Sequence, residues 1–328
     1  MRVLITGGAG FVGRHFIEAL GDGTNEIIVV DNYVAGGGAL EVSQWRINPG
    51  LKVDFINQDC REFFLQDRTK FDLVIHLAAV IGGRLTIELN PLAVAEDLSI
   101  DSHFWKWALI TMPNHVISFS SSAAYPVSLQ TDSLPKLLSE NMINFSDTLG
   151  MPDMTYGWAK LTHEYLGQLA HKVSGIKIAC YRPFSGYGSD QSTDYPFPAI
   201  CKRALENKGK KEFQVWGSGN QQRDFIHIDD IVNAVLMTYQ KLTDGKAVNL
   251  CTGTGISFIE LAKKVCNIAG FDPQIKGDTK MPQGVHSRIG NPLLLNSLGW
   301  KPSTSLDFGI LDCLTYLKEK NQRVQNGI

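Results

Sequence analysis

The sequence of 328 residues has little net charge and no long apolar run. Its 31 basic residues stand against 33 acidic ones, which gives a formal net charge of −2. A chain so close to neutrality lacks the positive field that gathers nucleic acid or binds an anionic membrane surface. No apolar run approaches the ~18 to 20 residues that span a bilayer, and the first residues lead into a glycine loop, not a cleavable apolar signal. We therefore expect neither a nucleic-acid nor a membrane partner.

Cysteine pairs are also missing. The six cysteines are scattered and form no CxxC pair, at positions 60, 180, 201, 251, 266 and 313. This pattern fits neither a disulfide framework nor a zinc site, so we expect no metal and we expect reduced thiols in a cytoplasmic protein.

The first half of the chain alternates apolar runs with helical segments. The runs are nearly continuous, which is typical of strands covered on both faces in a parallel sheet. Candidate strands are 2–6, 26–31, 51–56, 71–79, 115–120 and 176–182, and candidate helices are 11–20, 91–110 and 156–173. This order predicts an α/β fold with a doubly wound parallel sheet.

The pattern loosens after about residue 183, where proline and glycine become frequent. We expect a first domain over residues 1–182 and a smaller C-terminal lobe over 183–222 and 251–328. The strand-and-helix pattern of residues 223–250 predicts that this segment returns to the first domain, so that the two are interleaved.

A glycine loop, GGAGFVG, occupies residues 7–13 between the first strand and the first helix. Gly7 permits a tight turn, Gly10 lets backbone amides approach a pyrophosphate, and Gly13 lets the helix pack closely on the strand. The second strand ends in Asp31, which can accept both ribose hydroxyls of NAD and would repel the 2′-phosphate of NADP. Together these features predict a Rossmann-type domain that binds NAD. Asp59, at the end of the third strand, is a candidate near the adenine or a plain turn residue.

Tyr156 and Lys160 are four residues apart in a predicted helix, so they share one face. A free phenol, with a pKa near ~10, is a poor base at neutral pH. A neighbouring ammonium and an oxidised nicotinamide would lower that pKa. Tyr156 could then take a hydroxyl proton while hydride leaves the same carbon.

Three serines, at 120, 121 and 122, end an apolar strand. Ligands of parallel sheets sit at the carboxyl ends of the strands. We therefore expect at least one of these hydroxyls to contact a substrate oxygen and the phenol, while another caps backbone groups at the turn.

These motifs occur in the order seen in a known family. The sequence resembles the extended short-chain dehydrogenase/reductases, which act on nucleotide sugars; the motifs are GGAGFVG, Asp31, HLAA (76–79), the three serines, Tyr156 with Lys160, RPFSGYG (182–188) and RDFIHIDD (223–230). The resemblance covers nearly the whole chain. IGG (81–83) and VWGSGNQQRDFIHIDD (215–230) are most similar to GDP-sugar members such as GDP-mannose 3,5-epimerase and GDP-fucose synthase.

The resemblance implies a set of site residues. The catalytic ones are Tyr156, Lys160 and a serine, Ser121 when counted back from Tyr125 and Ser122 when counted forward, of which we favour Ser121. Cofactor contacts are implied for Gly7, Gly10, Phe11, Val12, Gly13, Asp31, Asn32, Asp59, Cys60, Leu77, Ala78, Ala79, Tyr156 and Lys160. Substrate contacts are implied for Gly82, Gly83, Ser122, Ala123, Tyr195, Arg223 and Arg288, the two arginines facing the diphosphate.

Two of these positions depart from the family pattern. Relatives that epimerise beside a keto group carry a cysteine where this chain has Ala123, and a histidine or lysine where it has Tyr195. Alanine cannot move a proton, and tyrosine is a reluctant base without help. The expected activity is therefore that of an NAD-dependent 4-epimerase or 4-dehydrogenase of a nucleotide sugar, with GDP favoured over UDP, in a homodimer. The alternatives are a GDP-sugar 3,5-epimerase with other bases and a catalytically silent NAD-binding scaffold.

Overall fold

The computed structural model describes residues 1–21, 23–34, 39–42, 45, 52–80, 84–131 and 136–325. Its largest element is a seven-stranded sheet in which every pair is parallel. The order is β11-β7-β5-β4-β1-β2-β3. The strands are β1 (Arg2–Thr6), β2 (Glu26–Asp31), β3 (Val53–Asn57), β4 (Leu73–His76), β5 (His115–Phe119), β7 (Lys177–Pro183) and β11 (Asp244–Leu250). The predicted doubly wound α/β fold is confirmed.

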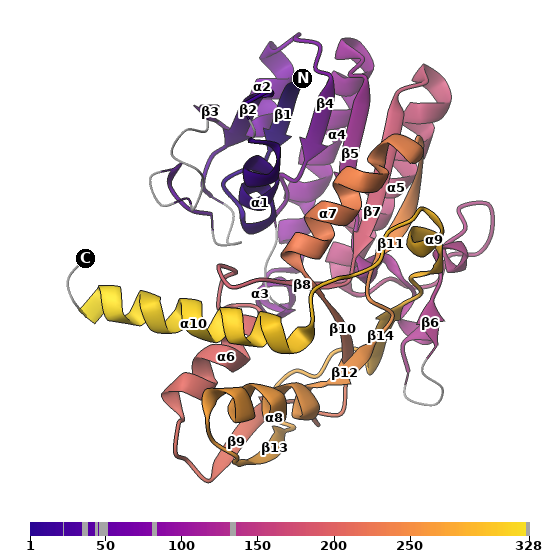
Figure 1. The fold of residues 1–328 in the computed structure, drawn as a ribbon. Coiled ribbons are helices and arrows are strands. Elements are labelled where there is room, and N and C mark those ends of the chain that lie inside the picture. Colours follow the sequence, from indigo (N-terminus) through magenta and orange to yellow (C-terminus); the bar gives the residue numbers. More distant parts are fainter. Residues whose placement is uncertain are drawn as a thin grey trace.

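Helices cover both faces of this sheet, which explains why the central strands bury almost every side chain. One apolar layer contains side chains of α1 (Phe11–Leu20) and α7 (Ile228–Thr238). The opposite layer contains side chains of α2 (Cys60–Gln66), α4 (Val94–Thr111) and α5 (Met154–Ser174). Figure 1 shows the long α4 and α5 lying side by side behind the strands.

A second, smaller lobe lies below the sheet in Figure 1. Its main sheet has the order β12-β10-β14-β6, with β8 paired to β10, and a two-stranded sheet joins β9 to β13. The strands are β6 (Leu137–Leu138), β8 (Ser185–Tyr187), β9 (Glu212–Trp216), β10 (Gln222–His227), β12 (Gly255–Ser257), β13 (Gln274–Asp278) and β14 (Ser287–Gly290). A separate apolar core joins α6 (Pro196–Glu206), α8 (Phe258–Ala269) and α10 (Leu306–Gln325). Two short helices, α3 (Arg84–Leu89) and α9 (Leu293–Ser297), complete the fold.

The ends of the helices follow local sequence signals. Helix α8 begins with a capping box, in which the Ser257 hydroxyl accepts from the Glu260 amide and the Glu260 carboxylate accepts from the Ser257 amide. Helix α5 ends at Gly175, whose φ of 76° a residue with a side chain rarely adopts. Among the described helices none is both long enough and apolar enough to cross a membrane.

The chain crosses between the lobes more than once. Residues 222–227 form β10 in the second lobe, and the next residues form α7, which packs against α1. Strand β11 then pairs with β7 and so forms one edge of the main sheet. In the other direction, β6 leaves the first half of the chain to pair with β14. This connectivity brings the carboxyl ends of the main strands to face the second lobe.

Candidate active site

The glycine loop is shaped by close approaches of the backbone. Gly7 follows β1 with a φ of 73°, and a Cβ there would lie 2.7 Å from the amide nitrogen of Ala78. A Cβ on Gly13 would lie 2.5 Å from the Cα of Gly8. The loop and the segment after β4 are therefore in close contact. This segment contains Leu77, Ala78 and Ala79, whose contact with the cofactor stays a prediction. Gly10 precedes α1 as its N-cap, so the first-turn amides of Phe11 and Val12 are directed out of the helix end.

Asp31 lies beside this loop at the end of β2. Its carboxylate accepts the Ala9 amide at 2.9 Å and the Tyr33 amide at 2.8 Å. Burial raises the pKa of Asp31, and the two amide hydrogen bonds oppose that rise. One carboxylate thus ties the glycine loop to the second strand and keeps lone pairs for further donors. A glycine-rich loop next to a fixed acid fits the pyrophosphate and ribose of NAD.

Asp59, which was predicted near the adenine, and two other predicted cofactor contacts, Asn32 and Cys60, already have partners within the chain or are buried. Asp59 caps α2 by accepting the Arg61 amide, and its carboxylate also accepts the Arg61 guanidinium at 2.7 Å. Hydrogen bonds from Arg61 hold the pKa of Asp59 below its usual range. Asn32 accepts the Val34 amide at 3.2 Å, and Cys60 is buried in the first turn of α2. Asp59 is thus a helix cap, and its contact with the adenine stays a prediction.

The three serines at the end of β5 have different partners. Ser120 donates to Glu164, which also holds Arg182 in a buried ion pair of 2.6 Å. Ser121 accepts the Ala123 amide at 3.1 Å and forms a side-chain hydrogen bond with Tyr156. Ser122 is buried in the short 3₁₀ turn Ser122–Ala124. Of the three hydroxyls, that of Ser121 is the one that helps to lower the pKa of the Tyr156 phenol. Its assignment as the catalytic serine stays a prediction.

Tyr156 and Lys160 share a face of α5, with the Lys160 ammonium 5.6 Å from the centre of the phenol ring. Burial raises the pKa of Tyr156, while Lys160 and the Ser121 hydrogen bond oppose the rise. Burial pulls the pKa of Lys160 down, but nearby negative groups outweigh it and raise that pKa. The lowered phenol pKa predicted from the sequence is therefore not reached by the chain alone.

Burial is the main reason, and a pair of carboxylates on α4 adds to it. Asp97 and Asp101 are 1% and 3% exposed, and both raise the pKa of Tyr156. Asp97 accepts the Val80 amide at 2.5 Å through one oxygen, and its other oxygen has no hydrogen-bond partner in the described structure. Asp101 lies 3.3 Å from His76 and 3.1 Å from His163. These acids balance the charge of Lys160 inside the protein.

His76 completes this buried cluster. Its ring stacks on Phe104 with centroids 3.9 Å apart, and its Nδ1 lies 2.7 Å from the Thr6 hydroxyl. Burial lowers the pKa of His76 to about 4, so the imidazole is neutral at pH 7. Its place is thus structural, between the first strand and α4.

The two predicted substrate arginines lie next to each other. Arg223 of β10 and Arg288 of β14 are partners in a parallel pair, so their side chains leave the same face of the sheet. Arg288 donates to Gln130 and to Asp153, at 2.6 Å in both cases. The Arg223 guanidinium lies 5.9 Å from the centre of the Phe258 ring.

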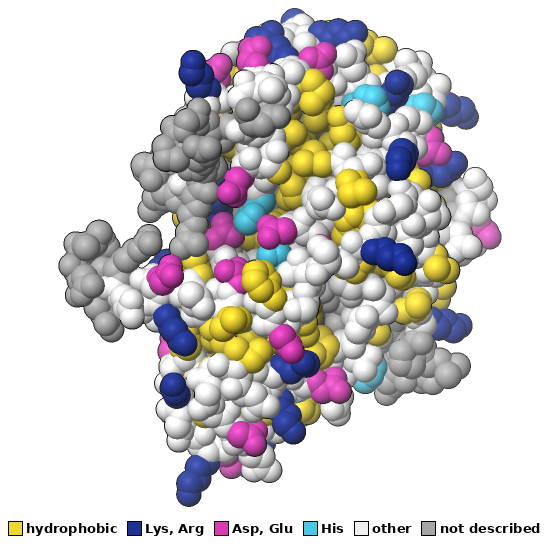
Figure 2. Space-filling model, in the orientation of Figure 1, with side chains coloured by type: hydrophobic (Ala, Val, Ile, Leu, Met, Phe, Trp, Pro, Cys, Tyr) yellow, Lys and Arg dark blue, Asp and Glu magenta, His cyan; other side chains and the backbone are white. Residues whose placement is uncertain are grey.

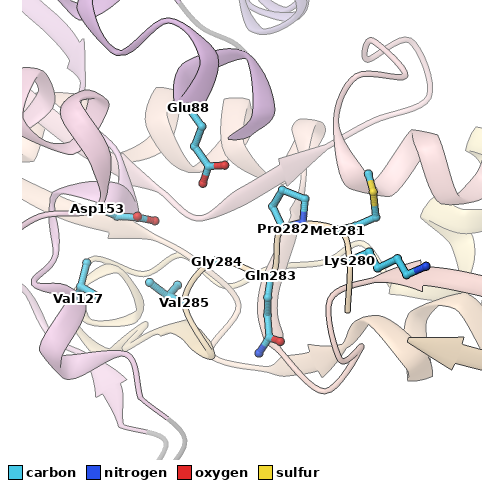
Figure 3. Close-up of a pocket in the computed structure, with 9 residues that line it drawn as sticks. All are labelled: Glu88, Val127, Asp153, Lys280, Met281, Pro282, Gln283, Gly284 and Val285. Carbon is cyan, nitrogen blue, oxygen red and sulfur yellow. The ribbon is translucent and has the colours of Figure 1, made fainter. Parts of the chain in front are cut away.

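A cavity of about 560 Å³ opens between the lobes, and Asp153, the ion-pair partner of Arg288, lines it. Glu88 of α3 and Asp153, the N-cap of α5, line it from the first lobe. The segment between β13 and β14 lines it from the second lobe (Figure 3). Its lining residues are Glu88, Val127, Asp153, Lys280, Met281, Pro282, Gln283, Gly284 and Val285. The cavity is large enough for part of a nucleotide-sized ligand.

Ala123 and Tyr195, the two positions that depart from the family pattern, lie near the start of α5. Ala123 is buried, and its carbonyl accepts the Asp153 amide at 2.9 Å. Burial raises the pKa of Tyr195, and the nearby Tyr156 and Asp194 raise it further, so still less of the basic phenolate form is present at neutral pH. Gly82 and Gly83 lie outside the described residues.

Comparison with known proteins decides the family. The model of the NAD dependent epimerase/dehydratase family matches residues 3–251, which is most of the chain. The chain belongs to this family. It is therefore an NAD-dependent enzyme, and the predictions of the family and of the cofactor are confirmed.

Curated relatives cover almost the full length. The chain is 27% identical to "GDP-L-fucose synthase" of Sinorhizobium fredii, over 94% of this chain and 93% of that protein. It is 29% identical to "Putative UDP-glucose 4-epimerase" of Methanocaldococcus jannaschii, over 98% and 99%. The crystal structure of UDP-glucose 4-epimerase with UDP-glucose from Thermotoga maritima has a TM-score of 0.80, 24% identity, and coverage of 98% and 100%. This last likeness shows the fold.

Sequence reasoning missed the polar residues that act through tertiary contacts. Asp97 and Asp101 are four residues apart on α4, and this spacing predicts that they share a helix face. It does not predict that they lie near Lys160. Asp153 and Gln130 carried no signal, because their partner Arg288 is more than 130 residues away.

Proposed function

We propose that this enzyme oxidises the 4-hydroxyl of a nucleotide diphosphate sugar, as a 4-epimerase or a 4-dehydrogenase. The observation that carries the proposal is the assembled set of Ser121, Tyr156 and Lys160 at the carboxyl ends of the strands, beside a glycine loop and Asp31. Such a set is suited to removing a hydroxyl proton. It also argues against a silent scaffold, which would have no need of it.

The proposed roles follow from the contacts. Tyr156 takes the proton from the sugar hydroxyl, Ser121 holds the phenol and the reacting oxygen, and Lys160 stabilises the phenolate. NAD, when bound, accepts the hydride from the same carbon. Since the phenol pKa is high in the chain alone, the positive charge of the oxidised cofactor would favour phenolate only after loading.

For the nucleotide we propose GDP, because the sequence motifs resemble those of GDP-sugar enzymes and one similar protein is named a GDP-L-fucose synthase. A relative of comparable identity is named a UDP-glucose 4-epimerase, so UDP-sugars belong in the same assay. Arg223 and Arg288 are the proposed diphosphate ligands, since a guanidinium presents a planar fork of donors to phosphate oxygens. The six buried free cysteines support a reducing compartment, and we propose the cytoplasm.

The test is an assay of GDP- and UDP-hexoses in heavy water, with products identified by NMR. We expect turnover at C4 and no deuterium at C3 or C5, because Ala123 cannot move a proton and the raised pKa of Tyr195 keeps its phenol protonated at neutral pH. Deuterium entering at C5 and persisting in Tyr195→Phe would favour the alternative, a 3,5-epimerase with other bases.

A further inference from the structure

An ion pair joins the two lobes at the edge of the cavity. Arg288 of the second lobe donates through Nη2 to Asp153 Oδ2 at 2.6 Å, and the two side chains are only 12% and 5% exposed. Asp153 is the N-cap of α5, three residues before Tyr156, yet its carboxylate makes no capping hydrogen bond to the helix. The carboxylate is thus turned away from its own helix and towards the arginine.

The Arg288 guanidinium has a second hydrogen-bond partner. Its Nε donates to Gln130 Oε1 at 2.6 Å. Gln130 is 1% exposed, and its own amide donates to the carbonyls of Tyr125 and Pro126. The guanidinium is therefore fixed in direction by Gln130, while Asp153 neutralises its charge.

Charge-assisted pairs of this kind are strong in a site with little water. Any anion that uses the same edge of the Arg288 guanidinium must displace the carboxylate. Arg223 lies beside Arg288 in register, so an incoming diphosphate would meet one arginine that is already paired with an acid.

We propose that Asp153 is an internal competitor for the substrate diphosphate, and so a determinant of substrate affinity and selectivity. This inference rests on the proposed function, which assigns the diphosphate to Arg223 and Arg288. Binding exchanges the carboxylate for a phosphate oxygen at Arg288 and releases Asp153 towards the cavity, which Glu88 and Lys280 also line (Figure 3). A ligand with less charge than a diphosphate displaces the carboxylate less readily, so the pair selects against nucleoside monophosphates.

Calorimetric titration of the full-length, NAD-loaded protein with UDP, GDP, UMP and GMP tests this. Asp153→Asn removes the competing charge and keeps a residue suited to an N-cap. We expect it to tighten diphosphate binding about tenfold, of the order that a charge-assisted hydrogen bond contributes, and to reduce the preference for diphosphate over monophosphate. Asp153→Ser serves the same purpose if the asparagine variant does not fold. Asp153→Glu, which keeps the charge, should not gain affinity.

Two further variants make the result specific. Glu88→Gln also removes one negative charge from the cavity lining but leaves the Arg288 pair in place, so it measures the general electrostatic effect, which should be clearly smaller. In an Arg288→Gln background, Asp153→Asn should gain no more affinity than Glu88→Gln does, because the pair that it breaks is already gone.

The outcomes distinguish a failure of the proposed competition from a failure of the proposed diphosphate site. If Asp153→Asn leaves diphosphate affinity unchanged or weakens it while Arg288→Gln weakens it, Asp153 only positions the arginine and the competition is disproved. If Arg288→Gln leaves diphosphate affinity unchanged, the proposed diphosphate site itself is wrong.

Discussion

At the scale of single residues, Ser121 and Ser122 are adjacent in the sequence but have different surroundings. Ser121 reaches the phenol of Tyr156, whereas Ser122 is buried in the following turn. We therefore expect the two hydroxyls to have different roles, which substitution of each one separates.

We predict that Tyr156→Phe keeps NAD and substrate binding but lowers turnover by ~10² to 10⁴, the usual contribution of a positioned acid–base group. Ser121→Ala should also slow turnover, because it removes the hydrogen bond to the phenol, and Ser122→Ala should slow it much less. Stopped-flow measurement of NADH formation checks all three. Normal turnover in Tyr156→Phe would refute the assigned base.

The buried carboxylates lead to a second prediction, on pH. Asp97 raises the pKa of Tyr156, so Asp97→Asn should lower it and move the acid limb of the kcat/KM profile to lower pH. The asparagine oxygen can still accept the Val80 amide, which keeps the local structure. Glu96→Gln is the matched control, because Glu96 is on the same helix but pairs with Arg61 at the surface. A shift of the acid limb to higher pH would contradict the electrostatic argument.

The residues found from the sequence were those with a local pattern. Tyr156 and Lys160 share a helix face by spacing, and Asp31 ends a strand that follows a glycine loop by a fixed interval. The pKa direction of Tyr156 could not be predicted in this way, since burial and Asp97 depend on how α4 packs against α5. Electrostatic balance in a core is a property of tertiary contacts.

At the scale of elements, the first turn of α5 packs unusually close to the end of β5. A Cβ on Gly157 would lie 2.4 Å from the carbonyl oxygen of Ala123 and 2.9 Å from Pro152. This approach places the phenol of Tyr156 against Ser121. The helix was predicted as 156–173 and is observed from Met154 to Ser174.

We predict that Gly157→Ala destabilises the protein by ~1 to 3 kcal/mol, the usual cost of overpacking, and slows turnover because the helix must move away from Ser121. Gly167→Ala, on the same helix, is the control: its Cβ would meet the Trp105 side chain at 3.2 Å, a neighbour that can adjust more easily than backbone. Chemical denaturation and the turnover assay measure both effects. Equal stability and activity of the two variants would show that the close approach is not needed.

At the scale of the whole molecule, an apolar stripe remains exposed on the outer helices. Trp158, Tyr165, Leu169 and Val173 of α5 are spaced along one helix face, and Leu98 and Leu109 on the adjacent α4 are exposed as well. The homodimer expected from the sequence is proposed to form through this stripe.

We predict that the protein sediments as a dimer and that Leu169→Glu shifts it to the monomer, because a charge would be buried in the pair. Met237→Glu, at another exposed apolar position on α7, is the control and should stay dimeric. Analytical ultracentrifugation over a range of concentrations distinguishes the two states. A wild-type monomer at all concentrations would disprove the proposal.

The fold class followed from continuous apolar runs, but the contents of the second lobe did not. Strands β6 and β12 are two and three residues long, too short for a periodic signal. Their pairing with β14 and β10 is set by residues far away in the chain.

The place of β11 at the edge of the main sheet has a consequence for synthesis. A ribosome releases residues 244–250 only after β8, β9 and β10 of the second lobe have emerged. Until then β7 presents one unpaired edge, the kind of edge that recruits other chains. The sheet of the first lobe is therefore complete only after β11 has been synthesised. A premature stop codon anywhere between residues 184 and 243 would release a fragment in which that edge of β7 stays unpaired.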